Sequence, residues 1–348
     1  MSTSRPIPRS QLGAVVRELP KAEVHLHLEG CIPSPVWLAA AERHGMTCPL
    51  PLVDGRPEIT SLQALLDHLD WACSLVDRAE DLRAIALATS QHLDRSGALH
   101  ADVIFNPTHW PHWRERAAEM VGELSAGFDE AERAGGATVN LCWSLNRRQS
   151  EAEANDVVDW LLAERAERVV GLSIDGNEAA GSNNERFAGA FRRAADAGLR
   201  RCAHAGESSG PGGVWEAIEL LGAERIDHGV RCVEEPALVR ELARRRIPLD
   251  VCPTSNVVLG VAESIAAHPV EALRRAGVRV SVNTDDPELY GIELAGEYEA
   301  CAAEFRWGAR QLGEVARTSI EASFASEDRK AAMLERLESF LEATIGGA

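Results

Sequence analysis

The sequence predicts a (β/α)8 barrel of the TIM type, with a helical insertion after the first strand and extra helices at the C-terminus. Two observations predict it. Short apolar runs with strand character recur eight times, and Ala- and Arg-rich stretches with helical spacing separate them. At 348 residues the chain has a length that such barrels reach as one unit, so we expect residues 1–348 to form a single domain.

The eight expected strands are short and are separated by helical patterns. They lie at residues 24–28, 101–106, 138–145, 169–175, 201–204, 226–228, 248–252 and 279–283. Apolar residues recur every three or four positions at 157–168, 184–197 and 236–245, which predicts helices there. The segment 33–99 is mostly helical in pattern and could cover the barrel mouth, and 308–345 predicts terminal helices.

The composition excludes several classes of partner. The net charge is −18, so the surface repels nucleic acid, and no apolar run approaches the length of a membrane span. Eight cysteines without a Cys-x-x-Cys pair, and a start without a secretory apolar region, are typical of reduced thiols in a cytoplasmic protein. Monomer and dimer stay equally open.

Two histidines mark the end of the first expected strand. His25 and His27 are two residues apart, so both side chains point to the same face of a strand and can address one ion. The alternative, that both only fill the core, is weaker because an unpaired imidazole is costly to bury.

Further polar residues follow later strands. His204 ends the fifth strand and Glu207 stands three residues on, His228 ends the sixth, and Asp285 with Asp286 follows the eighth. Each has an ordinary explanation, such as a cap, a satisfied histidine or a turn. Together they share the C-terminal face, where barrel enzymes place their reacting groups, so we interpret them as one site.

Zinc is the simplest common cause. Three imidazole nitrogens and one carboxylate oxygen would hold one ion per subunit and leave room for a water. The metal would lower the pKa of that water and so supply hydroxide. Glu207 is then free for proton transfer, and His228 and Asp285 can orient the hydroxide.

Five motifs resemble the adenosine deaminase family of zinc-dependent amidohydrolases. They are Leu-Pro-Lys-Ala-Glu-Val-His-Leu-His-Leu-Glu-Gly at 19–30, His-Ala-Gly-Glu at 204–207, Arg-Ile-Asp-His-Gly at 225–229, Cys-Pro-Thr-Ser-Asn at 252–256 and Ser-Val-Asn-Thr-Asp-Asp-Pro at 281–287. They run in family order over most of the chain. The resemblance implies hydrolytic loss of the 6-amino group of a small purine nucleoside as ammonia, which leaves a 6-oxo product.

The resemblance also assigns roles to individual residues. It implies that zinc is bound by His25, His27, His204 and Asp285. Glu207 would donate a proton to purine N1, hydroxide would attack C6, and His228 would position or deprotonate the water. Asp286 would hydrogen-bond N7, and the Gly176 backbone N–H would meet N3.

Three departures from the family pattern concern the substrate. Glu29 stands where adenosine-specific members usually carry the Asp that meets the sugar 5′-hydroxyl, so Glu29 becomes a candidate substrate-binding residue. Gly176 stands where free-base adenine deaminases of this kind typically have Ser, which favours a nucleoside. The loop 106–114 could stack Trp110 on a substituent and pair Arg114 or a histidine with an anion, or its tryptophans could simply pack on neighbouring helices.

Glu29 and this loop look similar to the branch that deaminates 6-amino-6-deoxyfutalosine, an adenosine analogue with a 5′ extension used in menaquinone synthesis. We therefore predict that substrate, with adenosine or 2′-deoxyadenosine in purine salvage as the alternative.

Rival classes are less well supported. A binuclear amidohydrolase typically needs a carboxylated lysine on the fourth strand, and the only lysines are Lys21 and Lys330. The zinc motif of cytidine deaminases is absent from the sequence. A catalytically silent nucleoside-binding barrel predicts a lost ligand or proton donor, yet all are present.

Overall fold

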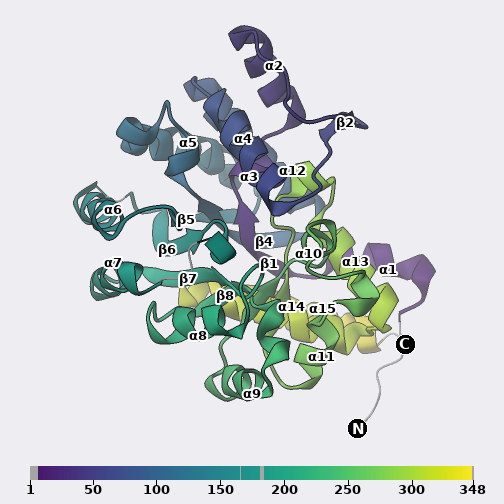
Figure 1. Cartoon of the computed structure of the whole chain (residues 1–348). Helices are drawn as coiled ribbons and strands as arrows, with labels where there is room; N and C mark the ends of the chain where they lie inside the picture. Colours follow the sequence, from purple (N-terminus) through teal and green to yellow (C-terminus); the bar gives the residue numbers. More distant parts are fainter. Residues whose placement is uncertain (1–6, 165, 181–183, 347–348) are drawn as a thin grey trace.

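Eight parallel strands form one sheet that curls into a barrel surrounded by helices (Figure 1). The computed structural model describes residues 7–164, 166–180 and 184–346. The strand order is β1-β4-β5-β6-β7-β8-β9-β10. The bounds are β1 Lys21–His27, β4 Ala98–Phe105, β5 Thr138–Asn146, β6 Val169–Asp175, β7 Arg200–Ala205, β8 Arg225–His228, β9 Leu249–Val251 and β10 Val280–Val282. The predicted (β/α)8 fold and its eight strands are confirmed.

The barrel closes through residues of the expected metal site. Leu26 forms a parallel bridge with Asp285, just beyond β10. The His27 N–H donates to the Asp285 carbonyl at 2.9 Å, and the Asp285 N–H donates to the His25 carbonyl at 3.2 Å. Closure of the barrel therefore fixes the backbone distance between these three residues.

Helices form the outer layer of the barrel. They include α4 Ala79–Arg95, α5 Ala117–Arg133, α6 Glu151–Glu164, α7 Glu185–Asp196, α8 Pro211–Glu219, α9 Pro236–Arg245, α11 Val270–Arg275, α14 Ala309–Ala322 and α15 Glu327–Gly346. The expected helix at 157–168 begins earlier, at Glu151. Ser150 and Glu153 form reciprocal hydrogen bonds there, a capping box that starts the helix.

The insertion after β1 is built from α2 Ser34–His44, a two-strand hairpin of β2 Leu52–Val53 and β3 Arg56–Pro57, and α3 Leu62–Ser74, followed by α4. The hairpin was not predicted. Its turn places Asp54 at φ 51° and Gly55 at φ 80°, the left-handed pair that an Asp-Gly dipeptide favours in tight hairpins. The remaining helices are the short α10 Pro253–Val258 and α12 Pro287–Tyr290, with α13 Leu294–Phe305 and α1 Arg9–Glu18, which lie side by side (Figure 1).

The barrel interior below the site holds a buried ionic cluster. The fully buried Arg225 donates to Asp102 at 2.5 Å and to the Val24 carbonyl at 2.8 Å, and its Nε lies 3.2 Å from Asp250 Oδ2. Burial raises the pKa of the Asp102 carboxyl, but Arg225 and His100 outweigh this effect and hold that pKa well below its usual range. The cluster ties β1, β4, β8 and β9 together beneath the residues that carry the chemistry.

Two expectations about the whole chain are tested by the fold. All eight cysteines are free, and seven of them are buried. Within the described ranges, no helix is long and apolar enough to cross a membrane.

Candidate active site

Four of the predicted zinc ligands converge at the C-terminal end of the barrel. The Nε2 atom of His204 lies 3.1 Å from that of His25 and 3.0 Å from that of His27. Asp285 Oδ1 lies 3.3 Å from Nε2 of each residue of the His25 and His27 pair. These separations match the edges of a tetrahedron around an ion with bonds of ~2.0–2.1 Å, the lengths typical of zinc.

Oxygen atoms on the far side of two rings set which nitrogen faces the centre. His25 Nδ1 lies 2.8 Å from the Asp250 carbonyl, so Nδ1 carries a proton and, in the neutral ring, Nε2 is bare. His204 Nδ1 lies 3.4 Å from Asp227 Oδ2, which favours the same tautomer. Two bare nitrogens facing each other at 3.1 Å repel unless a cation lies between them, so the residues fit a bound metal.

The charges around the centre also call for a cation. Burial lowers the pKa of His25, but the carboxylates of Asp285 and Asp227 outweigh it and raise that pKa to about 10 in the metal-free chain. Burial and the neighbouring imidazoles lower the pKa of His204 well below its usual range. Nitrogen and carboxylate ligands of this kind suit zinc.

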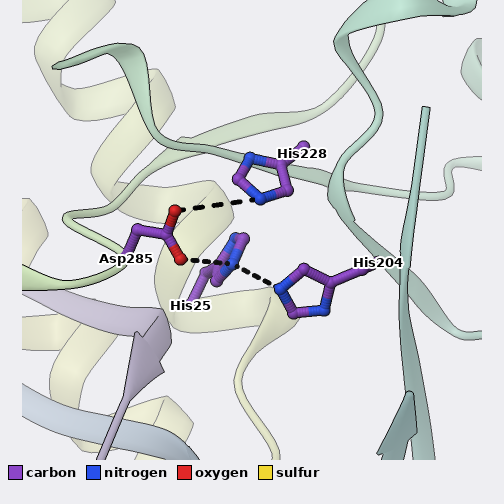
Figure 2. Close-up of side chains that lie close together, drawn as sticks. All are labelled: His25, His204, His228 and Asp285. Carbon is purple, nitrogen blue, oxygen red and sulfur yellow. Dashed lines mark hydrogen bonds and ion pairs between the residues drawn. The ribbon is translucent and has the colours of Figure 1, made fainter. Parts of the chain in front are cut away.

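A fourth imidazole also lies close. Ligand atoms of His25, His204, His228 and Asp285 lie within 4.8 Å of one another, and Figure 2 shows all four side chains pointing inward. His228 Nε2 is 3.9 Å from Asp285 Oδ2, farther than His27 is from the same carboxylate. The distances therefore favour His27 as the third imidazole ligand and place His228 beside the ion.

His228 and Asp285 share an unusual backbone. Their φ angles are +64° and +67°, the left-handed region that non-glycine residues rarely adopt. Each costs ~1–3 kcal/mol, which the surrounding structure must supply. The Ser255 hydroxyl, from α10, donates to Asp285 Oδ2 at 2.7 Å and helps to hold that carboxylate.

Glu207 is held by a carboxylate that the sequence did not single out as functional. The buried Glu178 accepts the backbone N–H groups of Gly206 at 2.7 Å, Glu207 at 2.9 Å and Ser208 at 3.1 Å, and also the Ser209 hydroxyl. Burial and the charges of Asp285 and Glu178 raise the pKa of Glu207 well above its usual range. A proton donor needs that protonated form.

Asp286 packs against Gly30. A Cβ atom on Gly30 would lie 2.1 Å from Asp286 Oδ1 and 2.5 Å from its Cα, so only glycine fits. Asp286 Oδ1 is buried and finds no hydrogen-bond partner within the described residues. Asp286 lines the hollow described below, where a substrate can supply a partner.

Glu29 also has one free oxygen. Its Oε1 accepts the Trp110 indole N–H at 2.7 Å and the Asn106 backbone N–H at 2.8 Å, while the buried Oε2 has no partner in the part of the chain described. Burial raises the pKa of Glu29. Trp110 therefore orients Glu29 instead of offering a face to a ligand.

The rest of that loop takes the second of the two predicted roles. Trp110 and Trp113 are fully buried, and Trp113 donates to the Val76 carbonyl at 2.7 Å. Arg114 is exposed and points away from the site. The expectation that Trp110 stacks on a substituent is wrong, because both tryptophans are fully buried, whereas the pairing of Arg114 or a histidine with an anion stays a prediction. His109 does reach the site, where Asp70 on α3 holds it at 2.5 Å.

These groups surround a hollow that opens to solvent. Its lining contains all the predicted site residues except His25. Helix α3 of the insertion contributes four leucines, Leu62, Leu65, Leu66 and Leu69, so this part of the insertion does cover the barrel mouth as expected. Gly176, at φ +91° just after β6, lies in the wall. Apolar sides and a polar floor suit a flat heteroaromatic ring.

A family model described as Adenosine deaminase matches residues 20–340. The chain belongs to the adenosine deaminase family. An adenine deaminase of Trichlorobacter lovleyi is 33% identical over 340 residues, covering 97% of each chain. Like this relative, other members of the adenosine deaminase family match nearly end to end: an adenine deaminase of Albidiferax ferrireducens is 35% identical over 345 residues, 98% of this chain and 99% of that protein.

Solved structures of family members are also similar. The adenine deaminase from Arthrobacter aurescens gives a TM-score of 0.85 at 32% identity, covering 93% of this chain and 99% of that one. An amidohydrolase from Burkholderia ambifaria, with bound Zn, gives a TM-score of 0.87 at 28% identity and covers 99% of both chains. Membership of this family shows that the protein is an enzyme of the class that deaminates aminopurines.

Proposed function

We propose that this protein is a zinc-dependent deaminase that hydrolyses the 6-amino group of a 6-aminopurine. The observation that carries the proposal is the convergence of three imidazole Nε2 atoms and the Asp285 carboxylate at 3.0–3.3 Å, next to Glu207 and Asp286. The ligands would be His25, His27, His204 and Asp285, with one ion per subunit. A cytoplasmic location, consistent with eight free cysteines, is part of the proposal.

The protein groups divide the work around the ring. Zinc, when bound, would supply Lewis acidity and lower the pKa of a water beside it. Glu207 gives its proton to purine N1, which makes C6 electrophilic, while Asp286 bonds N7 and the Gly176 N–H faces N3. The water oxygen bonds to C6, and of the two water protons one restores Glu207 and the other reaches the amino nitrogen. The C6–N bond then breaks, and ammonia leaves a 6-oxo purine that keeps the proton on N1.

The substrate carries no phosphate. Besides the proposed ligand Asp285, four carboxylates line the hollow, namely Glu29, Asp175, Glu207 and Asp286, and its described lining contains neither lysine nor arginine. Its one potential cation besides the metal-site imidazoles, His109, is committed to Asp70. A phosphate placed here would meet like charges with no guanidinium or ammonium to pair with, which is strongly unfavourable.

Among uncharged substrates we favour adenine. The curated relatives described above are named adenine deaminases. Glu29 lies on the Asp286 side of the hollow, since the adjacent Gly30 contacts Asp286. That is the side of purine N9 when N7 meets Asp286. The N9–H of the free base is a donor that a nucleoside lacks, and it can satisfy Glu29 Oε2.

A nucleoside is the second candidate, and Gly176 favours it. Glycine at this position is the feature that distinguishes nucleoside deaminases from free-base enzymes in the resemblance given above. A sugar hydroxyl can also satisfy Glu29 Oε2. The prediction of aminodeoxyfutalosine rested on Glu29 and on the 106–114 loop. The loop no longer supports it, because its tryptophans are buried.

The test is the initial rate of 6-amino loss, followed by ultraviolet absorbance, on adenine, adenosine, methylthioadenosine and aminodeoxyfutalosine at equal low concentration. We expect kcat/KM for adenine to exceed the others by at least about tenfold, ~1.4 kcal/mol. A tenfold preference for adenosine or for a 5′-extended substrate would establish the second candidate. If none of the four substrates is turned over, the result would contradict deamination and favour the catalytically silent nucleoside-binding barrel.

A further inference from the structure

A buried chain of hydrogen bonds leads from a backbone amide to His228. The Val270 N–H, at the start of α11, donates to His268 Nδ1 at 3.2 Å. His268 Nε2 lies 3.0 Å from Asn256 Oδ1, and Asn256 Nδ2 lies 3.2 Å from His228 Nδ1. His268, Asn256 and His228 are all at most 3% exposed, so water does not compete for these groups.

The direction of this chain is fixed at its first bond. A backbone N–H can only donate, so His268 Nδ1 must accept and the single proton of the neutral ring lies on Nε2. Burial supports neutrality, since it lowers the pKa of His268 to about 4. His268 Nε2–H then requires the oxygen of the Asn256 amide, which turns the amide NH2 toward His228. His228 Nδ1 must therefore accept.

We propose that Asn256 and His268 are positioning residues that hold neutral His228 in the tautomer with its proton on Nε2. That atom points into the reaction centre, 3.5 Å from Glu207 Oε1 and 3.9 Å from Asp285 Oδ2. A protonated Nε2 can donate a hydrogen bond to the attacking oxygen, but it can neither ligate a metal nor take up a proton. The inference rests on the proposed deamination for its catalytic meaning, while the tautomer itself does not.

The opposite tautomer is disfavoured by the same contacts. A proton on His228 Nδ1 would face the Asn256 NH2, and rotating the amide would then place its NH2 against His268 Nε2–H. Both arrangements leave two buried donors facing each other. This chain of hydrogen bonds thus also explains why four imidazoles meet at this centre although only three are proposed as ligands.

The decisive experiment is 15N NMR of the zinc-loaded full-length protein with 15N-labelled histidine. The His228 signals are assigned by their loss in His228→Gln. We expect a non-protonated Nδ1 and a protonated Nε2 for His228. A protonated Nδ1, or Nε2 shifted by direct metal ligation, would overturn the inference whatever the substrate proves to be.

Two variants connect the tautomer to turnover. Asn256→Asp keeps the shape but offers two acceptors, so His228 should move its proton to Nδ1. We expect a fall in kcat of at least 10²-fold with KM within about threefold, because a wrong tautomer in a serine-protease triad costs about 10⁴. His268→Gln keeps a donor toward Asn256 Oδ1, and its kcat should stay within about fivefold of wild type.

Asn155→Asp, on the outer helix α6, is the matched control and should leave kcat unchanged. Wild-type kcat in a folded, zinc-loaded Asn256→Asp protein would contradict the proposal. Should that variant not fold, the spectrum of the wild-type protein still decides. If His228 shows the expected tautomer but adenine and the nucleosides are not turned over, the proposed function fails and the tautomer assignment survives.

Discussion

Replacing Glu178 with glutamine tests whether the loop that carries Glu207 must be held in place for catalysis. The Glu178 carboxylate accepts three consecutive backbone N–H groups, at residues 206–208, with bonds of 2.7–3.1 Å. It lies two residues after Gly176, just beyond β6, so it links the wall proposed to face purine N3 to the proposed donor of the N1 proton. No substrate atom has to touch Glu178 for it to affect turnover.

The magnitude follows from the donors that each variant strands. A glutamine whose oxygen replaces Oε1 still accepts from Glu207 and Ser208, but its NH2 faces the Gly206 N–H. One unsatisfied buried donor costs ~1–3 kcal/mol of stability. Alanine strands all three backbone donors, for a loss of roughly 3–9 kcal/mol. A shift of ~1 Å in the proton donor costs ~10² in rate, so we expect kcat to fall ten- to a hundredfold in Glu178→Gln.

The assay combines kcat and KM on adenine, zinc content and urea unfolding for Glu178→Gln and Glu178→Ala. Glu153→Gln is the matched control, because Glu153 also accepts a backbone N–H, at the start of α6, but is exposed and outside the site. The reasoning would be refuted by a Glu178→Gln protein that is less stable yet keeps kcat within twofold of wild type, because Glu178 would then serve only the fold.

Four further substitutions test single contacts. Glu207→Gln should keep zinc but lose roughly 10² or more in kcat, the usual reach of a positioned acid, and near-normal turnover with metal bound would rule Glu207 out. Asp285→Ala should release zinc on dialysis, as read by atomic absorption, whereas undiminished zinc would contradict its role as a ligand. Glu29→Gln places an NH2 where Oε2 meets N9–H, so the adenine-to-adenosine ratio of kcat/KM should fall at least about tenfold, and an unchanged ratio would remove Glu29 from the N9 contact. Gly30→Ala drives a Cβ into Asp286, with a loss of ~1–3 kcal/mol of stability from overpacking and a sharply raised KM; kinetics like those of wild type would show that Asp286 does not need this contact.

The barrel and the convergence of the proposed metal ligands were predictable, because the spacing of apolar residues marks the strands and the position of each polar residue at a strand end marks the site. Alternating or continuous apolar runs mark strands, and His25 with His27 share a face by the geometry of a strand alone. The Asp54-Gly55 hairpin was missed although its dipeptide is a known turn signal. The early start of α6 was missed because the Ser150 and Glu153 cap lies outside the apolar period that was followed.

Other site residues could not be found this way because their roles depend on partners distant in sequence. Glu178 acts on a loop that begins 28 residues later, at Gly206. Asn256 and His268 matter only because the Val270 amide sets the direction of their hydrogen bonds. Trp110 illustrates the opposite error: an aromatic residue in a catalytic-face loop suggests stacking, yet its indole N–H is used to orient Glu29.

The position of the barrel seam links fold stability to chemistry. The backbone of Asp285 pairs with both His25 and His27, while its side chain lies 3.3 Å from both imidazoles. The left-handed φ of Asp285 is what allows one residue to do both, since it turns the chain out of the β10 direction just where the carboxylate must point inward. A metal bound only by the folded chain stabilises it by mass action, and here it would do so at a seam that, in the described residues, is joined by the bridge between Leu26 and Asp285. Loss of the metal should therefore weaken the β1 to β10 seam before the rest of the sheet, and hydrogen exchange of the His27 and Asp285 amides reports that difference directly.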